Sequence, residues 1–234
     1  MAREQERRGG THGRRPGGHR GGGKPRSDAR RAALGALYDV LYKGAYAQLA
    51  LGRALESVRL SPDDRRLATN LFYTAVERRL QLEYYLSRFI SETPDNVVMA
   101  LLLLSAAQLL YMDKIPDFAV VNEAAKLTRS FGFEGQTGFV NGVLRAFARA
   151  RDAGELTPPD EAEQPVAHLS IAYSVPEALI ERLIAAHGLE FARAMLAYAP
   201  DVHSETIRPI LCGIRPKASR NPSKGAAGTT KKRP

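Results

Sequence analysis

The chain has 234 residues, 44% of them hydrophobic, which suits one globular domain with appendages or two small domains. Its single cysteine, Cys212, excludes an internal disulfide bond and fits a reducing compartment, so we expect a cytoplasmic protein. The most apolar run, residues 97–112, is interrupted by polar side chains and is shorter than the roughly 18 apolar residues of a membrane-spanning helix. We therefore expect no membrane partner.

The net charge of +9 is concentrated at the two ends of the chain. Residues 1–31 carry +7 and residues 215–234 carry another +7, so the remaining residues sum to −5. The Arg/Gly-rich segment 1–26 and the basic segment 209–234 have too few apolar side chains to offset the entropy of ordering, which predicts disordered tails. Such basic arms attract polyanions without sequence specificity, although a solubilising tail explains the charge equally well.

Between these tails, apolar residues recur at helical spacing and start signals separate one helix from the next. A helix over residues 28–43 ends at Gly44, and a second helix follows it. The segment Ser61-Pro62-Asp63-Asp64 starts a third helix, because serine can cap it and proline suits its first turn. The pattern continues past Leu80 after a kink, which predicts a fourth helix.

Three further helices complete the pattern. Thr93-Pro94-Asp95 starts a helix whose residues 97–112 are apolar on all sides, which predicts a central, buried position. Pro116 starts the next helix, and the last one spans residues 136–152. No run of alternating residues predicts a strand, so we expect an all-α bundle of about seven helices over residues 27–152.

The amino-acid composition of the chain changes after this bundle. Residues 153–167 are acidic and contain several prolines, which predicts a linker. A helix opened by Pro176 and a shorter one ending near residue 199 follow, within residues 168–208. Because two small helices cannot build a core alone, we interpret this segment as the front edge of a second domain.

Three motifs within the bundle carry a family resemblance. They are QLLYMDKIP over residues 108–116, AVVNEA over residues 119–124 and GFVNGVLR over residues 138–145. In this order and spacing they resemble the NusB-like helical domain across roughly residues 27–152. We expect structural roles for the motif residues Gln108, Tyr111, Pro116, Asn122, Glu123, Asn141 and Gly142.

Two of these structural roles are specific. Asn122 and Glu123 are expected in a first helical turn, where polar side chains satisfy free backbone N–H groups. Gly142 lies inside a helix, where glycine costs up to about 1 kcal/mol relative to alanine. A close helix–helix contact at Gly142 would offset that cost.

The family has two branches, the free-standing NusB antitermination factors and the N-terminal domain of RsmB (Sun) methyltransferases, which make 5-methylcytosine in ribosomal RNA. Arg145 and the segment Ser174-Val175-Pro176 favour the second branch, although Ala178 replaces a tryptophan that is usual there. The resemblance ends near Arg208, and the enzyme's S-adenosylmethionine site and Pro-Cys motif have no counterpart, since Cys212 matches neither of its cysteine positions. We therefore expect no catalytic residue, no cofactor and no enzyme activity of this chain on its own.

Arginines are the candidate RNA contacts, because a guanidinium group pairs with phosphates and stacks on unpaired bases. The arginine-rich start of the first helix is similar to the RNA contact of the NusB branch. A second group lies on the third helix and its exit, where ion pairs with neighbouring acids are an equal alternative. The predicted RNA-binding residues are Arg26, Arg30, Arg31, Arg65, Arg66, Arg78, Arg79 and Arg145.

These observations favour binding of ribosomal RNA or its precursor by a NusB-like domain related to the methyltransferase. One alternative is a NusB-type antitermination factor that acts with a ribosomal protein. Another is a helical protein-interaction module, which the near-neutral charge of residues 32–152 allows, with 14 Lys/Arg against 13 acids. The five histidines show no metal-ligand spacing, so no metal site is expected.

Overall fold

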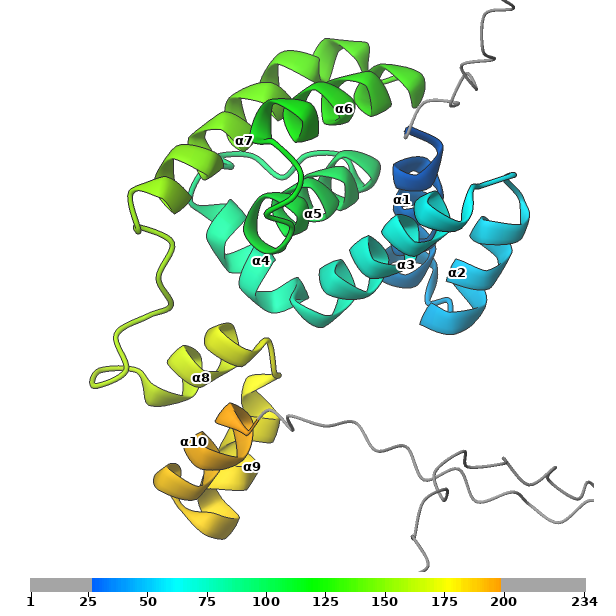
Figure 1. The fold of residues 1–234 in the computed structure, drawn as a ribbon. Coiled ribbons are helices and arrows are strands. Elements are labelled where there is room, and N and C mark those ends of the chain that lie inside the picture. Colours follow the sequence, from blue (N-terminus) through cyan, green and yellow to red (C-terminus); the bar gives the residue numbers. More distant parts are fainter. Residues whose placement is uncertain (1–26, 199–234) are drawn as a thin grey trace, which may run out of the picture. The chain divides into compact units, whose positions relative to one another are not determined.

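The computed structural model describes residues 27–198, which form ten α-helices and one 3-10 turn without a β-strand among them (Figure 1). The helices are α1 (Ser27–Lys43), α2 (Ala47–Glu56), α3 (Pro62–Glu77), α4 (Arg79–Ser87), α5 (Asn96–Tyr111), α6 (Asp117–Ser130), α7 (Thr137–Asp152), α8 (Pro165–Tyr173), α9 (Glu177–His187) and α10 (Leu189–Ala197). The 3-10 turn η1 (Glu134–Gln136) precedes α7. The prediction of an all-α fold is confirmed, while the predicted basic tails lie outside the described residues.

Local signals in the sequence set the starts of α3 and α5. The side chain of Ser61 caps α3 by accepting a hydrogen bond from the Asp64 N–H at 3.1 Å. Asp95 caps α5 in the same way, accepting from the Val97 N–H at 2.9 Å. The predicted kink is a break at Arg78, which separates α3 from α4.

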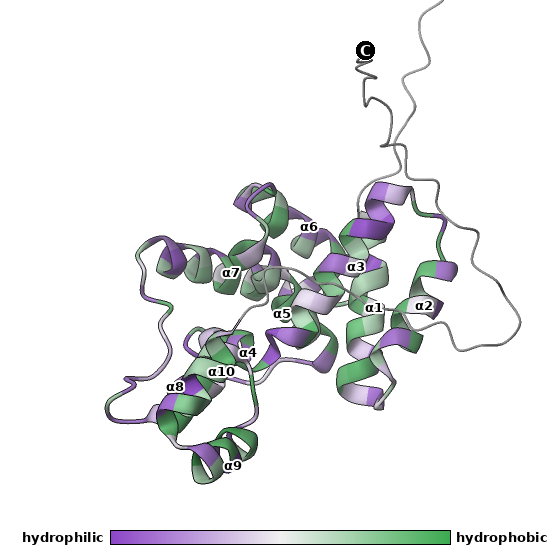
Figure 2. Ribbon diagram, turned by 60° about the horizontal axis from the view of Figure 1, so that its bottom comes forward, coloured by the Kyte–Doolittle hydropathy of each residue, from purple (hydrophilic) through white to green (hydrophobic). Residues whose placement is uncertain are grey.

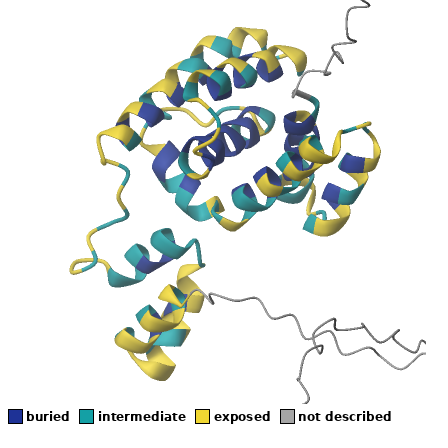
Figure 3. Cartoon of the chain, in the orientation of Figure 1, coloured by how far each residue is buried: buried dark blue, intermediate teal, exposed yellow. Residues whose placement is uncertain are grey.

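Helix α5 is the centre of the bundle, as its continuous apolar sequence predicts. It packs against α1, α3, α4, α6 and α7, and every residue from 100 to 109 is buried (Figure 3). The surrounding helices carry both hydrophobic and hydrophilic stretches, as expected for helices with one buried face (Figure 2). Burying each large side chain, such as Leu103 or Phe147, contributes about 1.5–3 kcal/mol relative to exposure.

The structure contains one helix that the sequence analysis does not predict. Helix α8 begins at Pro165, inside the segment interpreted as a linker, because proline suits a first helical turn. It packs against α4, where the Leu80 N–H donates to Ser174 Oγ at 3.0 Å. Helix α9 follows Pro176 as predicted, and Gly188, with a φ of +85°, ends it.

None of the helices in the described part of the chain is long and apolar enough to cross a membrane.

Candidate RNA interface

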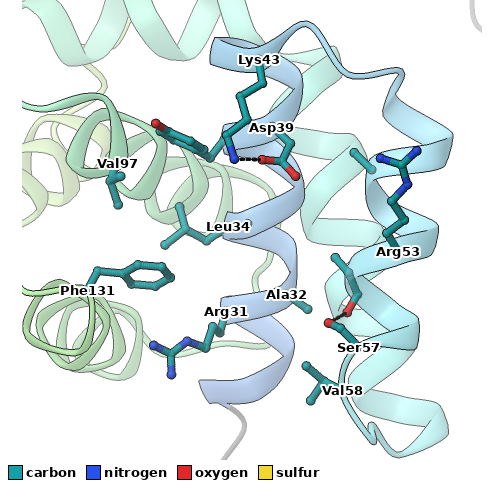
Figure 4. Close-up of a pocket in the computed structure, with 14 residues that line it drawn as sticks. Arg31, Ala32, Leu34, Asp39, Lys43, Arg53, Ser57, Val58, Val97 and Phe131 are labelled. Carbon is teal, nitrogen blue, oxygen red and sulfur yellow. Dashed lines mark hydrogen bonds and ion pairs between the residues drawn. The ribbon is translucent and has the colours of Figure 1, made fainter.

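A groove of about 600 Å³ runs along α1 and is bordered by α2, by Val97 at the start of α5 and by Phe131 after α6 (Figure 4). We call this the α1–α2 groove. Three cationic side chains line it, from Arg31 and Lys43 on α1 and from Arg53 on α2. The groove therefore joins apolar and basic groups at one surface.

Arg31 is exposed and is held against an aromatic ring. Its guanidinium carbon lies 4.9 Å from the centre of the Phe131 ring, and Nη2 donates to the Ser130 carbonyl oxygen at 3.3 Å. The two side chains point toward each other in Figure 4. A cation–π contact at an exposed site is worth about 0.5–1 kcal/mol, so it orients the guanidinium group while leaving it accessible to an anion.

The positive charge of the groove is only partly balanced. Lys43 Nζ lies 2.8 Å from Asp39 Oδ1, and this hydrogen bond raises the pKa of Lys43 above its ordinary value. Asp39 is the one acid among the lining residues. Among the described residues Arg53 has no acidic partner within ion-pair distance. Three cations face one carboxylate, which favours a polyanion.

Arg30 is buried, although its place in the sequence suggests an exposed position. Only 4% of its surface is exposed, and its Nε donates to Gln108 Oε1 on α5 at 2.7 Å. The guanidinium group faces the inside of the bundle because Arg30 lies on the side of α1 that packs against α5, whereas Arg31, about 100° further round the helix, points outward. In this arrangement Arg30 connects two helices instead of presenting its charge to a ligand.

The arginines of α3 lie at a different surface. Arg65 and Arg66 line a shallow groove together with Lys114, and this groove shares no lining residue with the α1–α2 groove. Arg65 Nη2 also lies 3.5 Å from the carbonyl oxygen of Leu55. The structure therefore does not bring these arginines together with Arg31.

The remaining predicted arginines have individual surroundings. Arg78 lies with its guanidinium carbon 5.6 Å from the centre of the Tyr111 ring. Arg79 forms an ion pair with Glu83 at 2.7 Å, which is the intrahelical alternative considered for this group. Arg145 is exposed on α7 and lines a groove between α6 and α7, whereas Arg26 lies outside the described residues.

Two motif residues, Gln108 and Tyr111, connect helices. Gln108 is buried and receives the hydrogen bond from Arg30. The Tyr111 hydroxyl donates to Gln81 Oε1 on α4, and burial raises the pKa of Tyr111 although Arg78 lowers it in part. Pro116 is the N-cap residue of α6. Gln108 thus links α5 to α1, and Tyr111 links α5 to α4.

Two expectations about the other motifs are wrong in detail. Asn122 and Glu123 lie in the second turn of α6, which begins at Asp117, so they do not cap its first turn. Glu123 instead forms an ion pair with Lys126 at 2.7 Å. Gly142 is exposed and a Cβ atom there would meet no atom within 4 Å, so no close helix–helix contact requires glycine.

Lys43, Arg53 and Phe131 are site residues that the sequence analysis does not identify. They come from three separate segments, and only the packing of α1 against α2 and α6 brings them to one groove. No spacing pattern in the sequence marks them. The described residues contain no group of three or more His, Cys, Asp or Glu side chains placed to hold a metal ion.

Comparison with known proteins agrees with this architecture. A relative named as a probable ribosomal RNA small subunit methyltransferase B, from Bacillus subtilis (strain 168), is 37% identical over 171 residues, which cover 71% of this chain and 37% of the relative. The transcription antitermination protein NusB of Xanthomonas axonopodis pv. citri (strain 306) is 34% identical over 141 residues, which cover 56% of this chain and 88% of the relative. The chain thus spans just over a third of the methyltransferase relative.

A crystal structure of the antitermination factors NusB and NusE in complex with dsRNA has the same fold, with a TM-score of 0.50 and 24% identity. That match covers 53% of this chain and 96% of the solved chain. Residues 27–149 match the model of the NusB family. The predicted resemblance is confirmed, and the chain belongs to the NusB family.

Proposed function

We propose that this chain binds RNA through the α1–α2 groove and acts as a binding module without a cofactor or a catalytic step of its own. The observation that carries the proposal is Arg31, an exposed guanidinium group held on the Phe131 ring beside two further cations. Phosphates pair with such groups, and a guanidinium plane can also stack on an unpaired base. Groups of this kind bind RNA but supply no nucleophile.

Ribosomal RNA or its precursor is the RNA that we propose as the ligand. The methyltransferase relative acts, by its name, on RNA of the small ribosomal subunit. Its alignment covers 71% of this chain, against 56% for the NusB relative, which supports the methyltransferase-related reading.

Antitermination together with a ribosomal protein is the second candidate function. It is favoured by the alignment that covers 88% of a NusB relative and by the solved NusB structure that contains NusE as well as dsRNA. Co-elution of the chain with such a protein and RNA in size-exclusion chromatography, but not with RNA alone, would favour this function over the first.

Fluorescence anisotropy with the full chain tests the proposal, using a labelled RNA and a series of salt concentrations. The double variant Arg31→Gln/Arg53→Gln removes two groove cations. The matched control Arg88→Gln/Arg182→Gln removes two exposed arginines outside every groove lined by the candidate residues. We expect at least a tenfold loss of affinity for the groove variant, and a salt slope that is smaller by about 1.4, since each phosphate contact to a single strand contributes about 0.7.

Equal losses in the two variants would contradict the proposal, because the affinity would then follow total charge. The basic tails would in that case be nonspecific polyanion arms, and the α1–α2 groove would be better explained as a protein-interaction surface. Thermal unfolding of both variants checks that the substitutions leave the fold intact.

A further inference from the structure

A second groove, of about 620 Å³, lies between α6 and α7 on residues that the proposed function does not use. We call it the α6–α7 groove. Three exposed arginines line it, namely Arg129 near the end of α6 and Arg145 and Arg149 on α7. Arg145 and Arg149 are four residues apart and so lie on the same face of α7.

The acids that line this groove are already bound by another residue. Asp117 Oδ2 lies 2.6 Å from Arg151 Nη2, and Asp152 Oδ1 lies 2.6 Å from the same nitrogen. Arg151 Nη1 also donates to the Leu109 carbonyl oxygen at 2.6 Å, which holds this side chain at the end of α7. Arg151 does not itself line the groove.

The groove therefore keeps an excess of positive charge, because its three arginines and Arg151 together face two carboxylates. Within the described part of the chain, none of them takes part in an ion pair. Three neighbouring like charges repel one another unless an anion lies between them. A ligand with several regularly spaced negative charges would relieve that repulsion.

An aromatic side chain lies beside these cations. Phe118, in the first turn of α6, lines the same groove and is 78% exposed, which is unusual for a phenylalanine. Alternating phosphates and flat bases in a single strand match a surface that combines guanidinium groups with an exposed ring. Asn122, which is exposed, lines the groove as well, and its side-chain amide can hydrogen-bond to base edges.

We infer that the α6–α7 groove binds a single-stranded RNA segment, with Arg129, Arg145 and Arg149 on phosphates and Phe118 stacked on an unpaired base. This inference rests on the proposed function and adds a second contact region to it. A duplex would satisfy the arginines but not the aromatic ring, because its bases are already stacked. An acidic peptide supplies charge without the regular alternation of anion and ring.

Anisotropy titrations of the full chain with a single-stranded RNA and with a duplex of equal length test the inference. The variants are Arg145→Gln/Arg149→Gln and Phe118→Ala, with Arg88→Gln/Arg182→Gln as the control for charge. We expect the arginine variant to weaken single-strand binding at least fivefold and to reduce its salt slope by about 1.4. Phe118→Ala should weaken single-strand binding at least about fivefold, as for loss of one stacked base, and leave duplex binding unchanged.

The outcomes separate this inference from the proposed function. If Arg31→Gln/Arg53→Gln loses RNA and both α6–α7 variants match the control, the inference is overturned and the proposed function stands. If the arginine variant weakens both RNAs equally and Phe118→Ala changes neither, the groove is not a single-strand site. If polyglutamate binds the wild-type chain without displacing RNA, and this binding is lost in the arginine variant, the groove is assigned to an acidic peptide. If the wild-type chain binds no RNA, both proposals fail.

Discussion

Arg30 on α1 donates a hydrogen bond to Gln108 on the central helix α5, at 2.7 Å and inside the bundle. The two residues are 78 positions apart in the chain. Gln108 begins the first family motif, and the contact gives it a structural task, because it ties α1 to α5. Arg31, the residue after Arg30, faces outward into the α1–α2 groove.

Replacing Gln108 by leucine tests this connection. Gln108→Leu keeps the volume of the side chain but removes an acceptor for a buried guanidinium group. Because hydrogen bonds to charged groups contribute about 1.5–3 kcal/mol, we expect the free energy of unfolding to fall by about that amount. Urea unfolding measures it, and Gln48→Leu at an exposed position of α2 is the control, expected to change stability by less than about 0.5 kcal/mol. Equal effects in the two variants would show that the buried contact contributes nothing.

The charge of the α1–α2 groove can be raised without adding a cation. Asp39→Asn removes the lining carboxylate that pairs with Lys43, while Lys43 stays protonated at neutral pH. One unit charge about 8 Å from a phosphate in water is worth about 0.5 kcal/mol, so we expect RNA affinity to rise about twofold at low salt. Asp113→Asn, an exposed acid outside this groove, should leave the affinity unchanged. A fall in affinity with Asp39→Asn would place the RNA elsewhere.

Ser174 caps the start of α4, although it lies 94 residues after Leu80 in the chain. Its Oγ accepts the Leu80 N–H at the start of α4, where no local side chain caps the helix, and its own φ of +56° is left-handed. Ser174→Gly loses the cap, which costs about 1 kcal/mol, but relieves the roughly 1–2 kcal/mol of strain that a Cβ atom causes in the left-handed region. Ser174→Ala loses the cap and keeps that strain, because alanine carries a Cβ atom as serine does.

Hydrogen exchange at the Leu80 amide and thermal unfolding measure these two effects. We expect faster exchange in both variants and the lower unfolding temperature in the alanine variant. Leu80 protection that is identical in all three proteins would mean that α8 does not hold the start of α4 in solution.

Tyr111 makes the stability of the bundle depend on pH in the alkaline range. Burial raises its pKa above the ordinary value of 10.0, so the folded chain keeps the phenol protonated where the unfolded chain ionises it. The resulting stabilisation is complete below pH 10.0 and is lost as pH rises through the folded pKa. Tyr111→Phe also removes the hydrogen bond to Gln81.

We therefore expect Tyr111→Phe to be less stable than the wild-type chain at pH 8, and the difference to narrow above pH 10. Chemical unfolding at a series of pH values measures both. Two stability curves that stay parallel through this range would show that Tyr111 titrates alike in the folded and unfolded chains.

The sequence was sufficient to predict every α-helix of the described residues except α8, because many signals for helix starts are local. Ser61 and Asp95 cap α3 and α5 through backbone N–H groups two or three residues away, as their positions predict. The continuous apolar residues of α5 also predicted its central position. The motifs of residues 108–145 predicted the family, which the match over residues 27–149 confirms. Helix α8 was missed because Pro165 and the acids before it are equally typical of a linker.

Which charges are available to a ligand depends on the packing of the helices. Arg30 and Arg31 are adjacent and chemically identical in the sequence, yet the packing of α1 on α5 buries one and exposes the other. Arg151 binds Asp117 and Asp152, which line the α6–α7 groove, so these two acids do not form ion pairs with its three arginines. Such outcomes depend on contacts between residues far apart in the chain. Composition and helical spacing fix which side chains share a helix face, but the packing of one helix on another fixes what each of those side chains meets.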